Sequence, residues 1–169
     1  MVDSLSAVQV LERVPGSIVD VGSGGGAPGV PLAAAFPNRE VTLLEASARK
    51  CDFLRRAAAD FSNVHVLHGR AEEQPVDAWD VAVAKALAEP PAAAEWCLAL
   101  VRPGGAAVLF VAAPPDTRRV TEVSHRLGGG EAEAVPVSAD RALLVLPKLE
   151  PTPAGFPRRP GAARKRPLA

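Results

Sequence analysis

Short apolar runs recur along the chain, and helical stretches separate most of them. Seven runs have the length and composition of strands: Ser17–Val21, Val41–Leu44, Val64–Leu67, Val81–Ala84, Ala107–Val111, Ala134–Val137 and Ala142–Leu146. The alternation of the first five with helices predicts a parallel sheet covered on both faces. Only four residues, 138–141, separate the last two runs, which predicts an antiparallel hairpin at the end of the sheet.

Three of the helical stretches carry local start signals. Ser47 is a suitable N-cap for a helix over Ala48–Phe61. Pro91 suits the first turn of a second helix over Ala92–Val101. A third helix is predicted over Asp116–Leu127, because three consecutive glycines follow it.

The stretch between the first strand and the next helix is rich in glycine. Five glycines fall within the eight residues from Gly22 to Gly29. Such a turn lets a ligand lie against bare backbone, since glycine adopts positive φ at little cost. The spacing fits two cofactor patterns. Gly22-x-Gly24-x-Gly26 is the S-adenosylmethionine form, and Gly24-x-Gly26-x-x-Gly29 matches the dinucleotide form.

Carboxylates around this loop favour S-adenosylmethionine over a dinucleotide. Asp20 directly precedes the loop, where it can accept hydrogen bonds from loop amides. Glu45 ends the second strand and can accept both ribose hydroxyls, which also suits NAD. The turn Gly69-Arg70-Ala71-Glu72-Glu73 follows the third strand, at the position that meets the adenine ring in methyltransferases.

Composition narrows the class of protein. A chain of 169 residues with 48% hydrophobic residues suits one domain with one core. No apolar run reaches the length of a membrane span, and no basic segment precedes an apolar one at the start, so neither a span nor a signal peptide is expected. Cys51 and Cys97 lack C-x-x-C spacing and are interpreted as reduced thiols of a cytoplasmic protein. No metal site is expected, because His65 and His68 face opposite sides of a strand.

Charge is distributed unevenly, although the formal net charge is zero. Residues 1–150 are interpreted as the catalytic-type domain, and 151–169 as a basic, proline-rich, extended tail. The tail has no acidic residue and five basic ones: Arg158, Arg159, Arg164, Lys165 and Arg166. Charge alone leaves two alternatives for it, contact with a polyanion or a disordered solubilising end.

The motifs together resemble the RsmG (GidB) family, whose members methylate N7 of a guanine in bacterial 16S ribosomal RNA. The resemblance covers nearly the whole chain. It rests on residues 20–31, Leu43-Leu44-Glu45, Arg49-Lys50, Phe53-Leu54-Arg55, Asn63-Val64, Gly69-Arg70-Ala71-Glu72, Trp96-Cys97-Leu98, Arg102-Pro103-Gly104-Gly105 and the tail motif from Thr152 to Leu168. It implies a class I S-adenosylmethionine-dependent methyltransferase fold, which is α/β and Rossmann-like, with a mostly parallel sheet and a C-terminal antiparallel hairpin.

The resemblance also implies roles for individual residues. With the carboxylate and glycines already described, it places cofactor contacts at Asp20, Gly22, Gly24, Gly26, Ala27, Glu45, Ala46, Ser47, Ala71, Glu72 and Lys85. It implies that the basic tail helps to hold RNA. No catalytic acid or base is expected, and Lys85 is a candidate for orienting the substrate or the cofactor carboxylate.

Three departures from the family pattern concern the RNA side of the site. The family carries an N-terminal helical segment before the equivalent of Asp3-Ser4-Leu5, which this sequence lacks. Lys85 stands where the family has arginine, and the fifth strand lacks the usual Lys-Gly pair.

The expected function is methylation of guanine N7 in 16S ribosomal RNA, with the RNA or the small ribosomal subunit as partner. The alternatives are a divergent methyltransferase acting on another RNA or a small molecule, and a catalytically weak RNA-binding relative.

Overall fold

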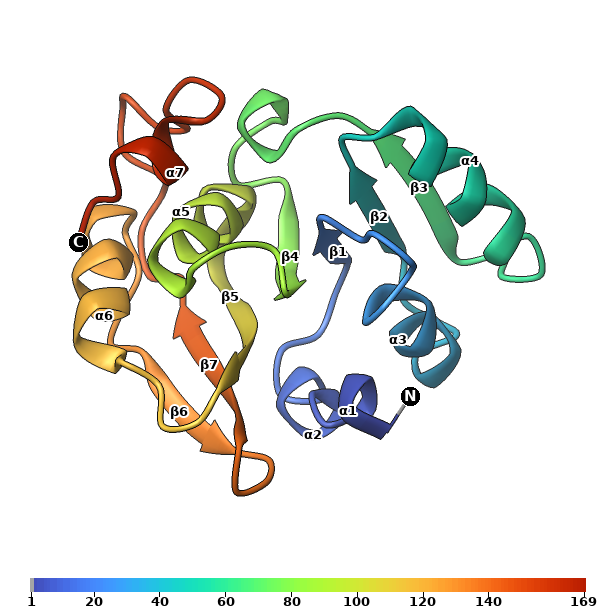
Figure 1. Ribbon diagram of the computed structural model, residues 1–169, viewed down its shortest axis with the longest axis horizontal. Helices are drawn as coiled ribbons and strands as arrows, with labels where there is room; N and C mark the ends of the chain where they lie inside the picture. The colour runs from blue at the N-terminus through green and yellow to red at the C-terminus, as the bar shows by residue number, and fades with distance from the viewer. Residues whose placement is uncertain (1) are drawn as a thin grey trace.

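One mixed seven-stranded sheet organises the computed structural model, which describes residues 2–169 (Figure 1). The strand order is β3-β2-β1-β4-β5-β7-β6. The strands are β1 (Ile18–Val21), β2 (Val41–Glu45), β3 (Val64–His68), β4 (Trp79–Lys85), β5 (Val101–Ala112), β6 (Glu133–Pro136) and β7 (Arg141–Pro147). The first five pair in parallel, whereas β7 runs antiparallel to both β5 and β6. The predicted sheet and hairpin are therefore confirmed.

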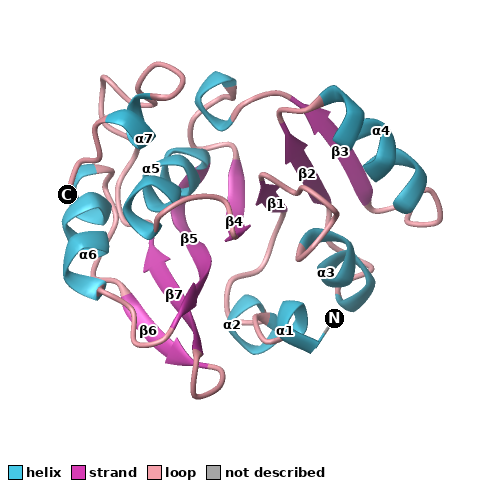
Figure 2. Ribbon diagram, viewed as in Figure 1, coloured by secondary structure: helices cyan, strands magenta, loops and turns pink. Residues whose placement is uncertain are grey.

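Helices cover both faces of the sheet (Figure 2). They are α1 (Val2–Leu5), α2 (Val8–Leu11), α3 (Gly29–Ala35), α4 (Ala48–Ala57), the 3-10 turn η1 (Ala71–Glu73), α5 (Pro90–Leu100), α6 (Thr117–Arg126) and α7 (Ala162–Lys165). Helix α4 is shorter than predicted, α5 begins earlier, and Val101 belongs to β5 rather than to the helix. The sequence did not predict α1 and α2.

Alternate residues of the central strands enter two different cores. Val19 and Val21 of β1 pack with α5, α6 and the C-terminal residues on one face of the sheet. Ile18 packs with α2, α3 and α4 on the opposite face. Because β1 is buried on both faces, its sequence is apolar at every position except Asp20 and does not alternate with exposed polar residues.

The sheet changes direction between β1 and β4. From β1 the chain proceeds outward to β2 and β3, and then returns to β4 on the other side of β1. In open α/β sheets, ligands bind beyond the carboxyl ends of the strands at such a switch point. The glycine-rich loop after β1 and the loop 86–89 after β4 both lie there, which places the candidate chemistry at this edge.

Residues 151–169, called here the C-terminal segment, are not the extended tail that the sequence predicted. They contain α7, and Ala163 is buried in the core formed with α5 and α6. Thr152 N and Oγ1 donate to the Asp77 carboxylate, and Arg158 forms a two-pronged ion pair with the buried Glu95. The five prolines and absent periodicity favoured an extended chain, but long-range polar partners fold the segment onto the domain.

Candidate active site

The glycine-rich loop, residues 22–28, turns sharply at Gly22, whose φ is +73°. Gly22 N and Ser23 N both donate to Leu44 O, at 2.8 and 3.1 Å, which holds the loop against the end of β2. A side chain at Gly22 would collide with Leu87 from the loop after β4. Glycine is required here by the backbone angle and by this close approach.

Glu45 joins the glycine-rich loop to the end of β2. Its Oε2 accepts from Gly24 N at 3.0 Å, and its Oε1 accepts from Ser47 N at 2.9 Å. A carboxylate offers about four lone-pair positions, so each oxygen keeps acceptor capacity after one amide bond. Glu45 is thus oriented by backbone amides while it retains the ability to bind a pair of hydroxyls.

Asp20 lies behind the loop rather than in contact with open space. The residue is 1% exposed, and its Oδ2 accepts from Gly29 N at 3.0 Å. A Cβ added to Gly29 would collide with this carboxylate and with Leu43, so the close approach fixes the start of α3. Burial raises the pKa of Asp20 to about 7, against the lowering effect of the Gly29 amide, and the Glu45 charge adds to the rise.

The raised pKa of Asp20 predicts that the protein loses stability as the pH rises from about 4 to above 7. The folded state binds this proton more tightly than the unfolded state, so folding is favoured while the carboxyl stays protonated and is opposed once it ionises. At about 1.4 kcal/mol per pKa unit, the cost reaches about 4 kcal/mol. Urea unfolding at pH 5 and pH 8 measures the part of this cost that accrues above pH 5, about 3 kcal/mol. Asp20→Asn, which keeps an acceptor for Gly29 N, should show a smaller decrease, and an equal decrease would contradict the assignment.

A cavity of about 380 Å³ opens at the switch point, and we call it the glycine-loop cavity. Its volume lies within the usual range of small-molecule sites. Of the residues predicted to contact the cofactor, five line it: Gly22, Glu45, Ala46, Ala71 and Glu72. They come from the ends of β1 and β2 and from η1, which are far apart in sequence, so the fold brings the predicted cofactor contacts together.

The other predicted cofactor residues are not among the lining residues described for this cavity. Asp20 is buried behind the loop, and Gly24 and Ser47 donate their amides to Glu45. Gly26 N donates to Ser23 O within the loop turn, and the neighbouring Ala27 is exposed. These residues shape the loop instead of facing the cavity.

Sequence reasoning missed a second group of lining residues. Leu87 from the loop after β4, Trp96 from α5, and Gly161 and Arg164 from the C-terminal segment also line the glycine-loop cavity. One signal was present in the sequence, because Glu95 lies within the otherwise apolar stretch of α5. A buried carboxylate requires a cationic partner, and the basic residues of the C-terminal segment were candidates for that role although they lie far from Glu95 in the sequence.

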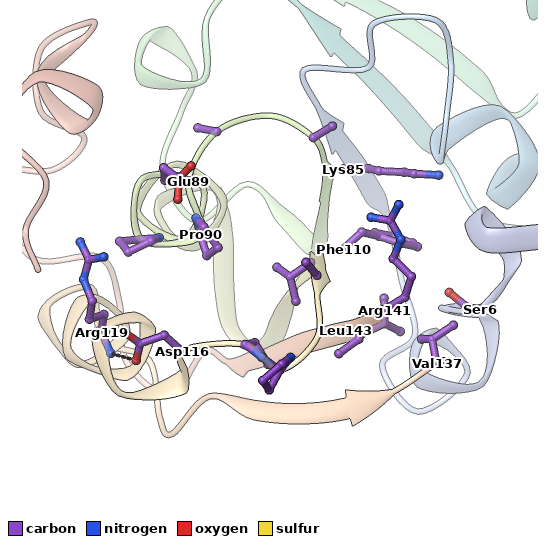
Figure 3. Close-up of a pocket in the computed structure, with 18 residues that line it drawn as sticks. Ser6, Lys85, Glu89, Pro90, Phe110, Asp116, Arg119, Val137, Arg141 and Leu143 are labelled. Atoms are coloured by element: carbon purple, nitrogen blue, oxygen red, sulfur yellow. Dashed lines mark hydrogen bonds between the residues drawn. The ribbon is translucent and has the colours of Figure 1, made fainter. Parts of the chain in front are cut away.

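A second cavity, of about 710 Å³, lies beside the first and shares Ala86 with it (Figure 3). Lys85 lines this second cavity and not the first, with its Nζ 5.8 Å from the centre of the Phe110 ring. Glu89 and Pro90, at the start of α5, form another part of the wall, and Arg141 approaches from β7. The arrangement combines an aromatic surface with charges of both signs.

The structure divides the five basic residues of the C-terminal segment into two groups. Arg158 is paired with Glu95, and Arg164 donates to Leu87 O at 2.8 Å. Arg159, Lys165 and Arg166 are exposed, and no ion pair of theirs is recorded within residues 2–169. Together with Arg158 they line a groove of about 710 Å³ to which none of the described acidic residues contributes.

The fold and the glycine-loop cavity define a class I S-adenosylmethionine-dependent methyltransferase. The oriented Glu45 carboxylate fits the ribose of that cofactor, and Gly22 lines the same cavity at the glycine-rich loop, where the amino-acid part would lie. The chain belongs to the GidB family, described as rRNA small subunit methyltransferase G, whose model matches residues 1–138. This finding confirms the family resemblance carried by the motifs.

Two relatives show how far the similarity extends. Ribosomal RNA small subunit methyltransferase G of Chloroflexus aggregans is 33% identical, over 99% of this chain and 76% of the relative. The protein of the same name from Lacticaseibacillus paracasei is 36% identical, over 98% of this chain and 76% of the relative. The aligned part therefore includes both cavities and the C-terminal segment.

Solved structures support the fold. A TehB-like methyltransferase from Corynebacterium glutamicum has a TM-score of 0.62 and 21% identity, over 85% of this chain and 86% of that chain. A T. thermophilus 16S rRNA N2 G1207 methyltransferase, solved with AdoMet and guanosine, has a TM-score of 0.61 and 19% identity, over 82% of this chain and 36% of that chain. Within residues 2–169, no helix is long and apolar enough to cross a membrane.

Proposed function

We propose that this protein transfers a methyl group from S-adenosylmethionine to N7 of a guanine in 16S ribosomal RNA. The observation that carries the proposal is the pair of adjoining cavities at the switch point. One is lined by Gly22, Glu45 and Glu72 and suits the cofactor, and the other adjoins it at Ala86 and suits a planar base. Membership of the GidB family supports the choice of ribosomal RNA.

The chemistry requires little of the protein beyond positioning. Guanine N7 carries a lone pair and no proton, so its methylation needs no general base. When bound, S-adenosylmethionine supplies an electrophilic methyl group on a positively charged sulfur. The chain contributes by holding the two reactants in line at about 3–3.5 Å. The glycine-rich loop and Glu45 fix one reactant, and the walls of the second cavity fix the other.

The second cavity has features that suit an unstacked base. Phe110 offers an aromatic face, and Pro90 adds an apolar surface on the opposite wall. Lys85 lies over the Phe110 ring, where its cation can bind a phosphate or an oxygen of the nucleotide. A guanine would have to leave its stack, or already be single-stranded, to enter. We therefore assign Lys85 to orienting the substrate rather than to binding the cofactor.

Mass mapping of 16S RNA tests the proposed reaction. Ribosomal small subunits and protein-free 16S RNA, both prepared from cells lacking the endogenous enzyme, would be incubated with the protein and isotopically labelled S-adenosylmethionine. We expect one labelled guanine in which the label resides on N7. Label at another atom or in another RNA would contradict the assignment, and cofactor binding without any methylated RNA would favour the catalytically weak alternative.

The exposed basic residues of the C-terminal segment predict a specific electrostatic effect. Replacing Arg159, Lys165 and Arg166 together with alanine removes up to three phosphate contacts. The slope of log affinity against log salt concentration should then become shallower by about 2–3. Filter binding to 16S RNA at several salt concentrations measures this slope. The control is Arg55→Ala with Arg56→Ala on α4, which should leave the slope near that of the wild type; equal slopes in all three proteins would contradict the RNA-binding role.

A further inference from the structure

The C-terminal segment forms one side of the glycine-loop cavity, and specific contacts hold it there. Gly161 N donates to Glu72 Oε1 at 2.9 Å. Arg164 Nη2 donates to Leu87 O at 2.8 Å, and its guanidinium carbon lies 5.5 Å from the centre of the Trp96 ring. Gly161, Arg164 and Trp96 all line the cavity. The C-terminal segment, more than a hundred residues from the glycine-rich loop in the sequence, thus completes its binding site together with Trp96 of α5.

These contacts lie at a definite end of the cavity. The glycine-rich loop and the oriented Glu45 suit the amino acid and ribose of the cofactor. Ala71, Glu72, Trp96 and Arg164 also line the cavity, as do the cationic Lys50 and Arg70. Because Glu72 is itself bonded to Gly161, the C-terminal segment meets the cavity at the end where the purine ring would lie.

Arginine is well suited to this position. Its guanidinium is planar and stacks on aromatic surfaces while it donates hydrogen bonds within its plane. The guanidinium carbon of Arg164 lies over the Trp96 ring, and one N–H donates to Leu87 O, which holds the group at the cavity wall. Stacking of a cation on an aromatic ring contributes about 0.5–2 kcal/mol. The Arg164 guanidinium can therefore bind an uncharged purine ring by stacking on it.

We infer that Arg164 is a binding residue for the purine end of S-adenosylmethionine, supplied by a segment outside the conventional loops of the site. The inference rests on the proposed cofactor chemistry, but it concerns a separate residue. It also assigns Arg164 a role distinct from that of the neighbouring Lys165, which lines the basic groove and not the glycine-loop cavity.

Calorimetry with two unreactive probes tests the inference in the full chain. S-adenosylhomocysteine contains both ends of the cofactor, whereas methylthioadenosine lacks the amino acid. Arg164→Ala should weaken both by a similar factor of about 5–10. Arg164→Lys should recover part of the affinity, and the control Arg118→Ala, which replaces an exposed arginine of α6 outside the lining of both cavities, should bind as the wild type. An unchanged affinity in Arg164→Ala would overturn the inference, as would a loss confined to S-adenosylhomocysteine, which would place Arg164 at the amino-acid end. Failure of the wild type to bind either probe would instead contradict the proposed function.

Hydrogen exchange of the wild-type protein provides a measurement that does not depend on a variant. The Gly161 amide is bonded to Glu72, and Lys165 N and Arg166 N are bonded within α7. S-adenosylhomocysteine should slow amide exchange across residues 161–166 as well as in the glycine-rich loop. Protection confined to the loop and Glu45 would overturn the inference.

Discussion

Gly22→Val should abolish binding of S-adenosylhomocysteine, with a loss of at least about 100-fold, or 2.7 kcal/mol. The φ of +73° at this position is unfavourable for a β-branched residue. The added side chain would also collide with Leu87 and occupy the cavity wall where the ligand meets the backbone. Calorimetry measures the affinity, and circular dichroism establishes that the sheet still forms.

The matched control is Gly25→Ala in the same loop. A Cβ at Gly25 meets no atom within 4 Å, and its φ lies outside the positive range that disfavours side chains. We expect its affinity to stay within about 3-fold of the wild type, or 0.7 kcal/mol. If Gly22→Val bound the probe as well as Gly25→Ala does, the glycine-loop cavity would not be the cofactor site. If both variants lost binding equally, general loop flexibility rather than the close approach at Gly22 would account for the effect.

Asp77→Ala should produce the largest loss of stability, about 3–5 kcal/mol. Lys148 is 1% exposed, and its Nζ lies 3.3 Å from the Asp77 carboxylate and 2.6 Å from Thr152 Oγ1. Burial alone would raise the pKa of Asp77, but hydrogen bonds from Thr152 and the charge of Lys148 lower it overall. Without this carboxylate a buried ammonium lacks its counter-charge, and the melting temperature should fall by roughly 10 °C.

Two other variants separate charge from geometry at this ion pair. Asp77 has a φ of +52°, which asparagine tolerates better than alanine, so Asp77→Asn removes the charge with little backbone strain. Lys148→Met should cost less than Asp77→Ala, because Leu98 O also accepts from Val101 N and Thr152 still bonds to Asp77. Thermal unfolding of all three ranks the effects. Methionine keeps most of the lysine stem, so a Lys148→Met variant less stable than Asp77→Ala would show that the hydrogen bonds of the ammonium to Leu98 O and Thr152 dominate, and not charge compensation.

The sheet and the glycine-rich loop could be predicted because their signals are local. The sequences of β1, β2 and β4 are predominantly apolar, and the short connection between β6 and β7 favours a hairpin. Glu45 was found because it follows directly on a buried strand. The carboxyl ends of parallel strands meet at one edge, so Gly22, Glu45 and Glu72 had to converge there.

The rest of the site depends on pairs of residues far apart in sequence. Nothing near Arg158 indicates that it will pair with Glu95, and nothing near Gly161 indicates Glu72. The C-terminal segment contains prolines and no apolar period, so its local pattern favours an extended chain. The burial of Ala163 and several polar contacts outweigh that local preference.

The arrangement of the C-terminal segment has a consequence for how the protein matures during translation. A nascent chain that has emerged through β7 possesses every strand of the sheet, along with Gly22, Glu45 and Trp96. It still lacks Gly161 and Arg164, which complete the wall of the glycine-loop cavity. A frameshift or stop codon after β7 would therefore leave all strands of the sheet in the product, with an incomplete cavity wall and with the buried Glu95 deprived of its partner Arg158.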